Sequence, residues 1–262
     1  MRKRHPLDSK LLCGALGAAG LFCVLEVAGR VGLIDPAAFP LASVVLGRAA
    51  SLVTDGEFLS DVLSTLGVWA TGLTIAFMVA VPAGFLLGTV PAAEKAMRPI
   101  VEFLRPIPSI ALIPLALAVF SERFDMKVTL VVYAATWPIL INTMYGLKDV
   151  DPLAKETLRS FGFGNPAVLW RVSLPSTAPF IATGVRLASA VALIVAISAE
   201  LLGGGSDGIG SYVLESAGGV DAVEYVTAAA MWAGVIGVLT NGLFVLVERR
   251  VFRWHTARTE VV

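Results

Sequence analysis

The sequence predicts an all-α polytopic membrane protein with six spanning helices, organised as a single domain over residues 1–262. Three observations predict this class: the composition, the long charge-free segments, and the placement of basic residues between them. Hydrophobic residues make up 56% of the chain, charged residues 15%, and the mean hydropathy is +0.81. Soluble globular chains are about 45–50% apolar and about 25% charged. The composition therefore excludes an ordinary soluble enzyme, and the balance of 20 basic and 20 acidic residues excludes a nucleic-acid binder.

The charge-free segments set the number of spans, because a helix needs about 20 apolar residues to cross the hydrocarbon core. Three segments have no charge at all over 32, 20 and 23 residues, namely 62–93, 128–147 and 225–247. Three others carry one or two charges, and one of them is expected to be bent by prolines. The six predicted spans are 11–29, 62–90, 99–121, 128–147, 177–202 and 225–247.

The first span also has the basic head and apolar run of a signal peptide. It lacks a clean A-x-A cleavage site, and Glu26 stands where small residues would be expected. We therefore interpret residues 11–29 as an uncleaved helix.

Basic residues predict the orientation, because cytoplasmic connections collect Lys and Arg. Of the 20 basic residues, 15 lie in the two tails and in the connections after spans 2 and 4, and four lie on the opposite side. The last one, Arg186, lies inside span 5. Both termini are therefore expected in the cytoplasm.

The connection 148–176 shows the clearest local pattern, with helix-start and helix-stop signals in succession. Asp or Asn followed by Pro is typical of a helix start, and Gly is typical of a helix end. The start signals are Asp151-Pro152 and Asn165-Pro166, and the stop signals are Gly162, Gly164 and Leu174-Pro175. Two short amphipathic helices joined at a glycine elbow are predicted. They would either lie on the lipid headgroups or form a knob that docks into a soluble partner.

The same segment resembles the "EAA" loop of ABC-importer permeases. Residues 156–162 (Glu-Thr-Leu-Arg-Ser-Phe-Gly) followed by 172–175 (Val-Ser-Leu-Pro) carry the glutamate, the glycine and the Leu-Pro of that motif. Thr157 and Leu158 replace its two alanines. Further segments resemble the nitrate/sulfonate/taurine subgroup, so that the resemblance covers roughly residues 63–250: these are 103–109, 111–115, 183–187, 199–203 and 208–210. The segment 119–123 departs from that subgroup, so the external end of span 3 is expected to differ.

This resemblance implies a type I ABC importer permease architecture and a permease subunit that forms the path for a small polar solute, such as a sulfonate, taurine, nitrate or a similar anion. It implies a second permease copy, two cytoplasmic ATPase subunits and a periplasmic or lipid-anchored solute-binding protein in a bacterial inner membrane. It also implies that ATP and Mg bind the partner ATPase and that this chain holds no cofactor. The residues expected to couple to the ATPase are Glu156, Leu158, Arg159, Phe161, Gly162, Leu174 and Pro175. Glu156 is expected to cap or pair within the loop and so to fix its shape.

Two charged residues inside span 5 are candidate pathway or gate residues, because charges in a bilayer are costly and often functional. Arg186 either lines the pathway and attracts an anion, or it snorkels to the interface or pairs with a carboxylate to anchor the span. Glu200 either holds an external gate or caps the glycine-rich connection that follows. The two residues are about 21 Å apart along the helix axis, so they are not expected to pair. Gly84 and Gly88 allow a close helix approach, either inside one protomer or between subunits.

Other motifs predict no catalytic site. Gly203-x-Gly205-x-x-Gly208 matches a dinucleotide fingerprint, but it follows a predicted membrane helix and lacks a preceding strand. Gly204-x-Ser206-x-Gly208 matches a nucleophile elbow, but the two histidines, His5 and His255, lie in tails across the bilayer. There is no P-loop and no Cys/His cluster, and Cys13 and Cys23 are too far apart on one helix for a disulfide. The alternative to an importer permease is an autonomous secondary transporter or channel without an ATPase.

Overall fold

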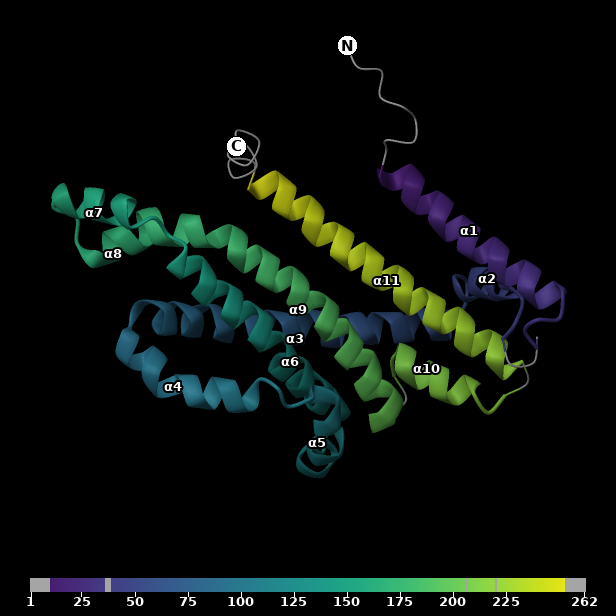
Figure 1. Cartoon of the computed structure of the whole chain (residues 1–262). Helices are drawn as coiled ribbons and strands as arrows, with labels where there is room; N and C mark the ends of the chain where they lie inside the picture. The colour runs from purple at the N-terminus through teal and green to yellow at the C-terminus, as the bar shows by residue number, and fades with distance from the viewer. Residues whose placement is uncertain (1–9, 36–38, 206, 220, 253–262) are drawn as a thin grey trace, which may run out of the picture. The chain divides into compact units, whose positions relative to one another are not determined.

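A computed structural model describes residues 10–35, 39–205, 207–219 and 221–252, and its regular structure in these ranges is entirely helical (Figure 1). The helices in chain order are α1 (Lys10–Arg30), α2 (Ala42–Leu52), α3 (Gly56–Thr89), α4 (Pro91–Leu104), the 3-10 turn η2 (Ser109–Leu112), α5 (Ile113–Val119), α6 (Arg123–Lys148), α7 (Pro152–Ser160), α8 (Asn165–Val168), the π turn η3 (Leu169–Ser173), α9 (Leu174–Gly203), α10 (Ile209–Ser216) and α11 (Ala222–Val251). The all-α class predicted from the sequence is confirmed, whereas the predicted number of six spans is not fully confirmed. Of the basic residues predicted in the tails, Lys10 begins α1 and Arg249 and Arg250 lie in the last turn of α11. The others, with His5 and His255, lie outside the described residues.

Among the described residues, four helical segments are long and apolar enough to cross a membrane. They are Gly56–Thr89, Arg123–Lys148, Asn165–Gly203 and Ala222–Val251. They correspond to predicted spans 2, 4, 5 and 6. The pair α4 and η2–α5 raises the number to five if its two bent parts count as one span. The predicted first span forms α1, which is not among these candidates.

The third predicted span, 99–121, is not the single bent helix expected from the sequence. α4 begins at Pro91, ends at Leu104, and is separated from η2–α5 by an 80° bend. Pro106 and Pro108 explain the break, because proline lacks an N–H and disfavours helical geometry in the residue before it. α4 has no buried residue, and its charged side chains Glu94, Lys95, Arg98 and Glu102 make it amphipathic.

The chain divides into two compact units, one of residues 1–60 with 212–234 and one of residues 61–211 with 235–262. In the first unit, Arg48 of α2 joins the start of α11. Its guanidinium donates to the carboxylates of Asp221 and Glu224 and to the Tyr225 hydroxyl, at 3.0–3.3 Å. The hydrogen bond with Glu224 raises the pKa of Arg48. α2 makes the connection between α1 and α3 partly helical.

The second unit is built on close contacts of α3 and α9 with α6, and glycines lie at these contacts. A Cβ atom at Gly84 of α3 would lie 2.7 Å from Thr143 Cβ, and one at Gly88 would lie 2.7 Å from Leu147 Cδ1. The Gly84/Gly88 pair therefore packs inside one protomer, which is the first of the two alternatives left open by the sequence. In membranes, small residues at helix contacts let the backbones approach closely.

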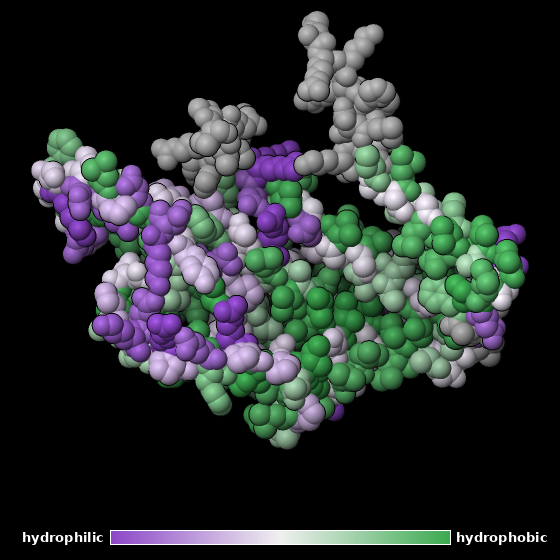
Figure 2. Space-filling view, viewed as in Figure 1, coloured by the Kyte–Doolittle hydropathy of each residue, from purple (hydrophilic) through white to green (hydrophobic). Residues whose placement is uncertain are grey.

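Polar side chains gather at one end of this second unit. Figure 2 shows hydrophilic residues over α7, α8 and α4, and Figure 1 shows that these helices lie at the same end of α3, α6 and α9. This end carries the two basic connections that the sequence assigns to one side of the membrane.

We expect Gly84→Val to destabilise the protein, because its side chain would overlap Thr143 and the Leu140 carbonyl oxygen, 3.2 Å from the Cβ position. Overpacking of this kind costs roughly 1–3 kcal/mol of unfolding free energy. Gly67→Val, in the same helix, is the control, because nothing lies within 4 Å of a Cβ there. Thermal unfolding in detergent should show a lower midpoint for Gly84→Val alone. Equal midpoints for the two variants would contradict the α3–α6 contact.

Candidate functional site

The loop between α6 and α9 begins with a capped helix, as the sequence predicts. Asp151 is the N-cap of α7, and its Oδ1 accepts a hydrogen bond from Leu153 N at 2.8 Å. Pro152 occupies the first helical turn, where a missing N–H costs nothing. The start of α7 is therefore held by local interactions of the loop itself.

The glycine elbow that ends α7 is also confirmed. Gly162 has φ +83°, a left-handed conformation that side chains other than glycine rarely adopt. Gly162 N donates to Arg159 O at 2.9 Å, and Phe163 N donates to Leu158 O at 3.2 Å. These bonds satisfy the last carbonyl oxygens of α7 and turn the chain toward α8.

The second half of the loop differs from the prediction in two ways. Gly164, not Asn165, is the N-cap of α8, and no side chain caps it. Leu174-Pro175 was expected to end the second helix, and this is wrong. Residues 165–203 form one apolar helical segment of 39 residues in which a π turn connects α8 to α9. Pro175 falls in the first turn of α9, where its ring is tolerated.

The loop exposes large apolar side chains. Leu153 is 68% exposed, Phe161 77% and Trp170 68%, while Leu158 is half-buried. Exposed apolar clusters of this kind are typical of interaction surfaces. The sequence reasoning missed Trp170 and Phe163. Their signal was available, because an aromatic residue next to polar residues in a short loop helix has no core of its own to enter.

Two basic residues hold the elbow and the glutamate does not. Arg159 Nη2 donates to Asn165 Oδ1 at 3.4 Å, and the Arg171 guanidinium lies 4.6 Å from the centre of the Phe163 ring. Glu156 is exposed, and its carboxylate has no hydrogen bond or ion pair within the part of the chain that the structure describes. The expectation that Glu156 caps or pairs within the loop is therefore not met.

Arg186 of α9 is paired with a carboxylate. Its Nη1 lies 3.4 Å from Glu248 Oε2 of α11, and Thr183 Oγ1 donates to the same carboxylate at 3.4 Å. The side chains of Arg186 and Glu248 remain 33% and 26% exposed. This geometry corresponds to the anchoring alternative for Arg186. No sequence pattern indicated Glu248 as the partner, because the two residues are 62 positions apart.

Glu200 lies at the centre of a buried polar network at the other end of α9. Its side chain has no exposed surface, and its carboxylate accepts from Thr65 Oγ1 at 2.9–3.0 Å and from Gly210 N at 3.0 Å. Lys127 Nζ, also buried, lies 3.9 Å from Glu200 Oε1 and donates to Asp207 O at 2.9 Å. Helices α3, α6 and α9 thus meet the glycine-rich connection in one cluster.

The same network holds the start of α10. Asp61 Oδ1 accepts from Gly208 N at 2.8 Å, and Thr65 Oγ1 accepts from Ile209 N at 2.9 Å. Together with Gly210 N, three successive backbone N–H groups find side-chain acceptors, which an exposed helix start would leave to water. Glu200 caps the glycine-rich connection, which is one of the alternatives that the sequence offered. Asp61, Thr65 and Lys127 were missed, because their partners are far away in sequence.

The two motifs that mimic catalytic sites do not have the context that such sites need. Gly203 is the last residue of a 39-residue helical segment, and Gly205 and Gly208 follow it, whereas a dinucleotide fingerprint follows a strand. Ser206, the residue in the nucleophile position of the other motif, lies outside the described residues. Within the described ranges, no group of three His, Cys, Asp or Glu side chains could hold a metal ion.

Residues 72–253 match the family described as binding-protein-dependent transport system inner membrane component. A probable ABC transporter permease protein of Brucella abortus (strain 2308) is 28% identical over 249 residues, which cover 95% of this chain and 96% of that protein. The taurine transport system permease protein TauC of Escherichia coli (strain K12) is 27% identical over 97% of this chain and 94% of its own. The nitrate import permease protein NrtB of Leptolyngbya laminosa is 28% identical over 76% of this chain and 70% of its own.

Solved structures show the same architecture. A bacterial alginate ABC transporter, crystallised in complex with an alginate pentasaccharide-bound periplasmic protein, superposes with a TM-score of 0.62 over 95% of this chain and 96% of that one. The sequence identity is 16%, so this likeness concerns the fold. It agrees with the helical architecture expected from the sequence.

We expect Glu200→Gln to lower the unfolding temperature, because it removes the carboxylate that faces the buried Lys127 ammonium within the described network. Breaking a buried ion pair costs about 3–5 kcal/mol. The double variant Glu200→Gln/Lys127→Met should be more stable than the sum of the two single effects predicts. Glu215→Gln, an exposed carboxylate, is the control. Additive effects in this double-mutant cycle would show that the two residues do not interact.

A second cycle tests the Arg186–Glu248 pair. Since both side chains are partly exposed, Arg186→Met and Glu248→Met should each lower stability by about 1 kcal/mol or less, and the double variant should lose little more. Solute flux should be retained in all three variants. Loss of flux in Arg186→Met, with normal flux in Glu248→Met, would instead assign Arg186 to the pathway.

Proposed function

The chain belongs to the family of binding-protein-dependent transport system inner membrane components and is a transmembrane permease subunit of an ABC importer, and from this premise we propose that its loop 148–176 couples ATP hydrolysis in a partner to the import of a small anion. The observation that carries this proposal is the set of exposed apolar side chains in the loop: Leu153 of α7, Phe161 at the end of α7, and Trp170 of η3. A permease that worked without a partner would have no use for such a surface in water.

The coupling surface is formed by the capped α7 and its glycine elbow. Phe161 and the half-buried Leu158 supply the apolar contact with the ATPase, and Gly162 gives the elbow its shape. Arg159 holds the elbow to Asn165. Glu156, exposed and without an intraloop partner among the described residues, is free to contact the ATPase itself.

Leu174 and Pro175 transmit the movement rather than ending the loop. They lie within the helical segment 165–203, which is about 58 Å long at the helical rise. A helix without a break moves as one body, so a displacement of α8 by the ATPase is passed along α9. The partner thereby biases a two-state element of the membrane domain.

The assembly consists of two copies of this chain, two cytoplasmic ATPase subunits, and a periplasmic or lipid-anchored solute-binding protein. The alginate transporter, crystallised in complex with its pentasaccharide-bound periplasmic protein, supports the last of these. ATP and Mg bind in the ATPase subunits, and this chain acts as a permease and not as an enzyme. Surrounding lipid completes its environment.

The protein is a multi-pass membrane protein, and we assign it to the bacterial inner membrane with both termini in the cytoplasm. The distribution of 15 basic residues to one side against four supports this orientation. The gathering of polar residues over α4, α7 and α8 is consistent with it, because these helices share one end of their unit (Figure 2).

The solute is proposed to be a small anion such as a sulfonate, taurine or nitrate. Relatives named for taurine and nitrate transport support this class. The family resemblance seen in the sequence points to the same class of solute.

Affinity purification of the tagged chain from mild detergent tests the proposal. Wild type should retain an ABC ATPase in about a 1:1 ratio. Gly162→Ala should lose most of it, because alanine at φ +83° costs roughly 1–2 kcal/mol and distorts the elbow. Gly164→Ala is the matched control, since Gly164 has φ −71° and a Cβ there makes an ordinary contact of 3.8 Å.

Two outcomes would count against this function. Wild-type chain recovered alone, even after gentle crosslinking, would favour the autonomous transporter or channel. Equal ATPase recovery for Gly162→Ala and Gly164→Ala would show that the elbow is not part of the coupling surface.

A further inference from the structure

The break between α4 and η2 separates two cavities of the second unit. One cavity, about 580 Å³, is lined by α4 and by the last turns of α6. The other, about 520 Å³, lies between the segment 105–109, the middle of α6 and α9. Arg105, Pro106 and Ile141 line both cavities. A water molecule occupies about 30 Å³ of liquid, so either cavity has room for a small solute with part of its hydration shell.

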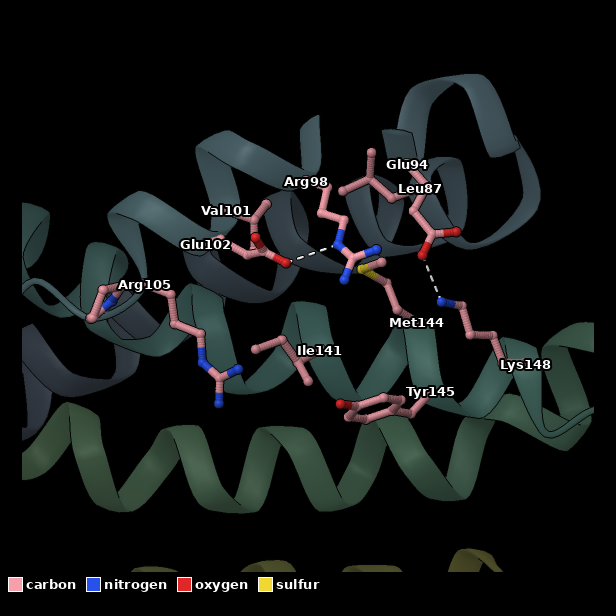
Figure 3. Close-up of a pocket in the computed structure, with 11 residues that line it drawn as sticks. Leu87, Glu94, Arg98, Val101, Glu102, Arg105, Ile141, Met144, Tyr145 and Lys148 are labelled. Atoms are coloured by element: carbon pink, nitrogen blue, oxygen red, sulfur yellow. Dashed lines mark hydrogen bonds and ion pairs between the residues drawn. The ribbon is translucent and has the colours of Figure 1, made fainter. Parts of the chain in front are cut away.

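The ion pairs in the wall of the first cavity leave one cationic side chain unpaired among the described residues. Lys148 Nζ lies 2.6 Å from Glu94 Oε1, and Arg98 Nε lies 2.8 Å from Glu102 Oε1. Figure 3 shows both pairs, and it shows the side chain of Arg105 extending toward Ile141 without a partner. No ion pair or hydrogen bond of the Arg105 guanidinium occurs with any residue that the structure describes. The cavity wall therefore has a net charge of +1 at Arg105.

The second cavity has Arg105 as its one charged lining residue among those described, and it also has polar donors. Trp137 lines this cavity with its ring, and its indole Nε1 is buried beside the Tyr133 ring instead of facing the cavity. Asn142 Nδ2 donates one of its two hydrogens to Pro138 O at 2.8 Å, which leaves the other hydrogen for a further acceptor. Ser109 adds a hydroxyl.

We propose that Arg105, with Asn142 and Ser109, forms a binding subsite for a small free oxyanion, of the sulfonate or nitrate class. A guanidinium offers a planar set of donors that matches two oxygens of such an anion. A bound anion would neutralise the unpaired charge of Arg105 and would accept hydrogen bonds from the donors of the second cavity. The idea that this anion is the transported solute rests on the proposed function.

The position of Arg105 at the end of α4 gives the subsite access from both cavities. Arg105 is the C-cap of α4, and the 80° bend follows it directly. Its neighbours Pro106 and Pro108 keep this segment out of helical geometry, so the guanidinium is held at the break instead of along a helix face. An anion bound there contacts both the paired charges of α4 and the apolar middle of α6.

Calorimetric titration of the purified chain in phosphatidylcholine nanodiscs tests the subsite with ethanesulfonate and nitrate as probes. Dimethyl sulfone, which has the sulfonyl group but no charge, is the control ligand. Wild type should bind both anions and not the sulfone. Arg105→Gln should weaken anion binding by about tenfold or more, the effect of losing a charged hydrogen bond. Arg105→Lys should lie between the two, because it keeps the charge but not the planar donors.

Lys95→Gln is the matched protein control. It removes one positive charge from the same helix, but Lys95 lines neither cavity. It should bind the anions as wild type does. Equal affinity of wild type and Arg105→Gln, binding of the sulfone as strong as that of ethanesulfonate, or absence of anion binding would each overturn the proposal.

Anionic lipid is the other source of an oxyanion, and a second titration separates it from free solute. Nanodiscs that contain phosphatidylglycerol should still bind ethanesulfonate in an Arg105-dependent way. An Arg105-dependent uptake of phosphatidylglycerol with no response to either free anion would assign the site to lipid phosphate and overturn the solute assignment.

The outcome is separable from that of the proposed function. If the ATPase co-purifies and anion binding does not depend on Arg105, the subsite proposal is wrong and the proposed function is retained. If the anions bind through Arg105 and no ATPase is recovered, the proposed function is wrong and the subsite proposal is retained.

Discussion

The contact between α6 and α9 is the interaction on which the second unit depends. A Cβ atom at Gly184 of α9 would lie 2.9 Å from Asn142 Cβ and 3.0 Å from Pro138 O of α6, and Ala188, Ala192 and Ala196 are fully buried along α9. Lipid tails are as apolar as the helices, so burial of apolar surface gives little drive for association, and close packing of small residues must provide it. Because α8, Arg186 and Glu200 all belong to the helical segment 165–203, this one contact positions them all.

The two ends of α9 are stabilised by different means. At one end Glu200, Lys127 and Thr65 form a dry network around the glycine-rich connection, and Gly208 approaches the Glu200 carboxylate so closely that no side chain fits there. At the other end the loop is held by its own caps and by partly exposed contacts. Breaking a buried network of this type costs a large free energy, whereas displacing short capped helices costs little free energy. The stability of this unit is therefore unequal along α9.

Features that depend on neighbouring residues could be predicted from the sequence, and features that depend on distant ones could not. The charge-free runs predicted the long helices, and Asp151-Pro152 and Gly162 predicted the ends of α7, because caps and left-handed turns are local. Pro175 was misleading, since proline marks the end of one helix or the first turn of the next, and only the π turn decides between them. The partners of Arg186 and Glu200, and the size of the bend after Arg105, depend on tertiary packing that no local pattern records.

The exposed side chains of the loop also bear on how the protein is made. Phe161, Leu153 and Trp170 are left uncovered by the rest of the chain. Such a surface attracts other apolar surfaces, including those of chaperones, proteases and further copies of itself. A cell that synthesises this subunit faster than its partners would accumulate unassembled subunits that aggregate and are rapidly degraded. The loop thus sets a demand on gene dosage: the subunits must be supplied together, in matched amounts.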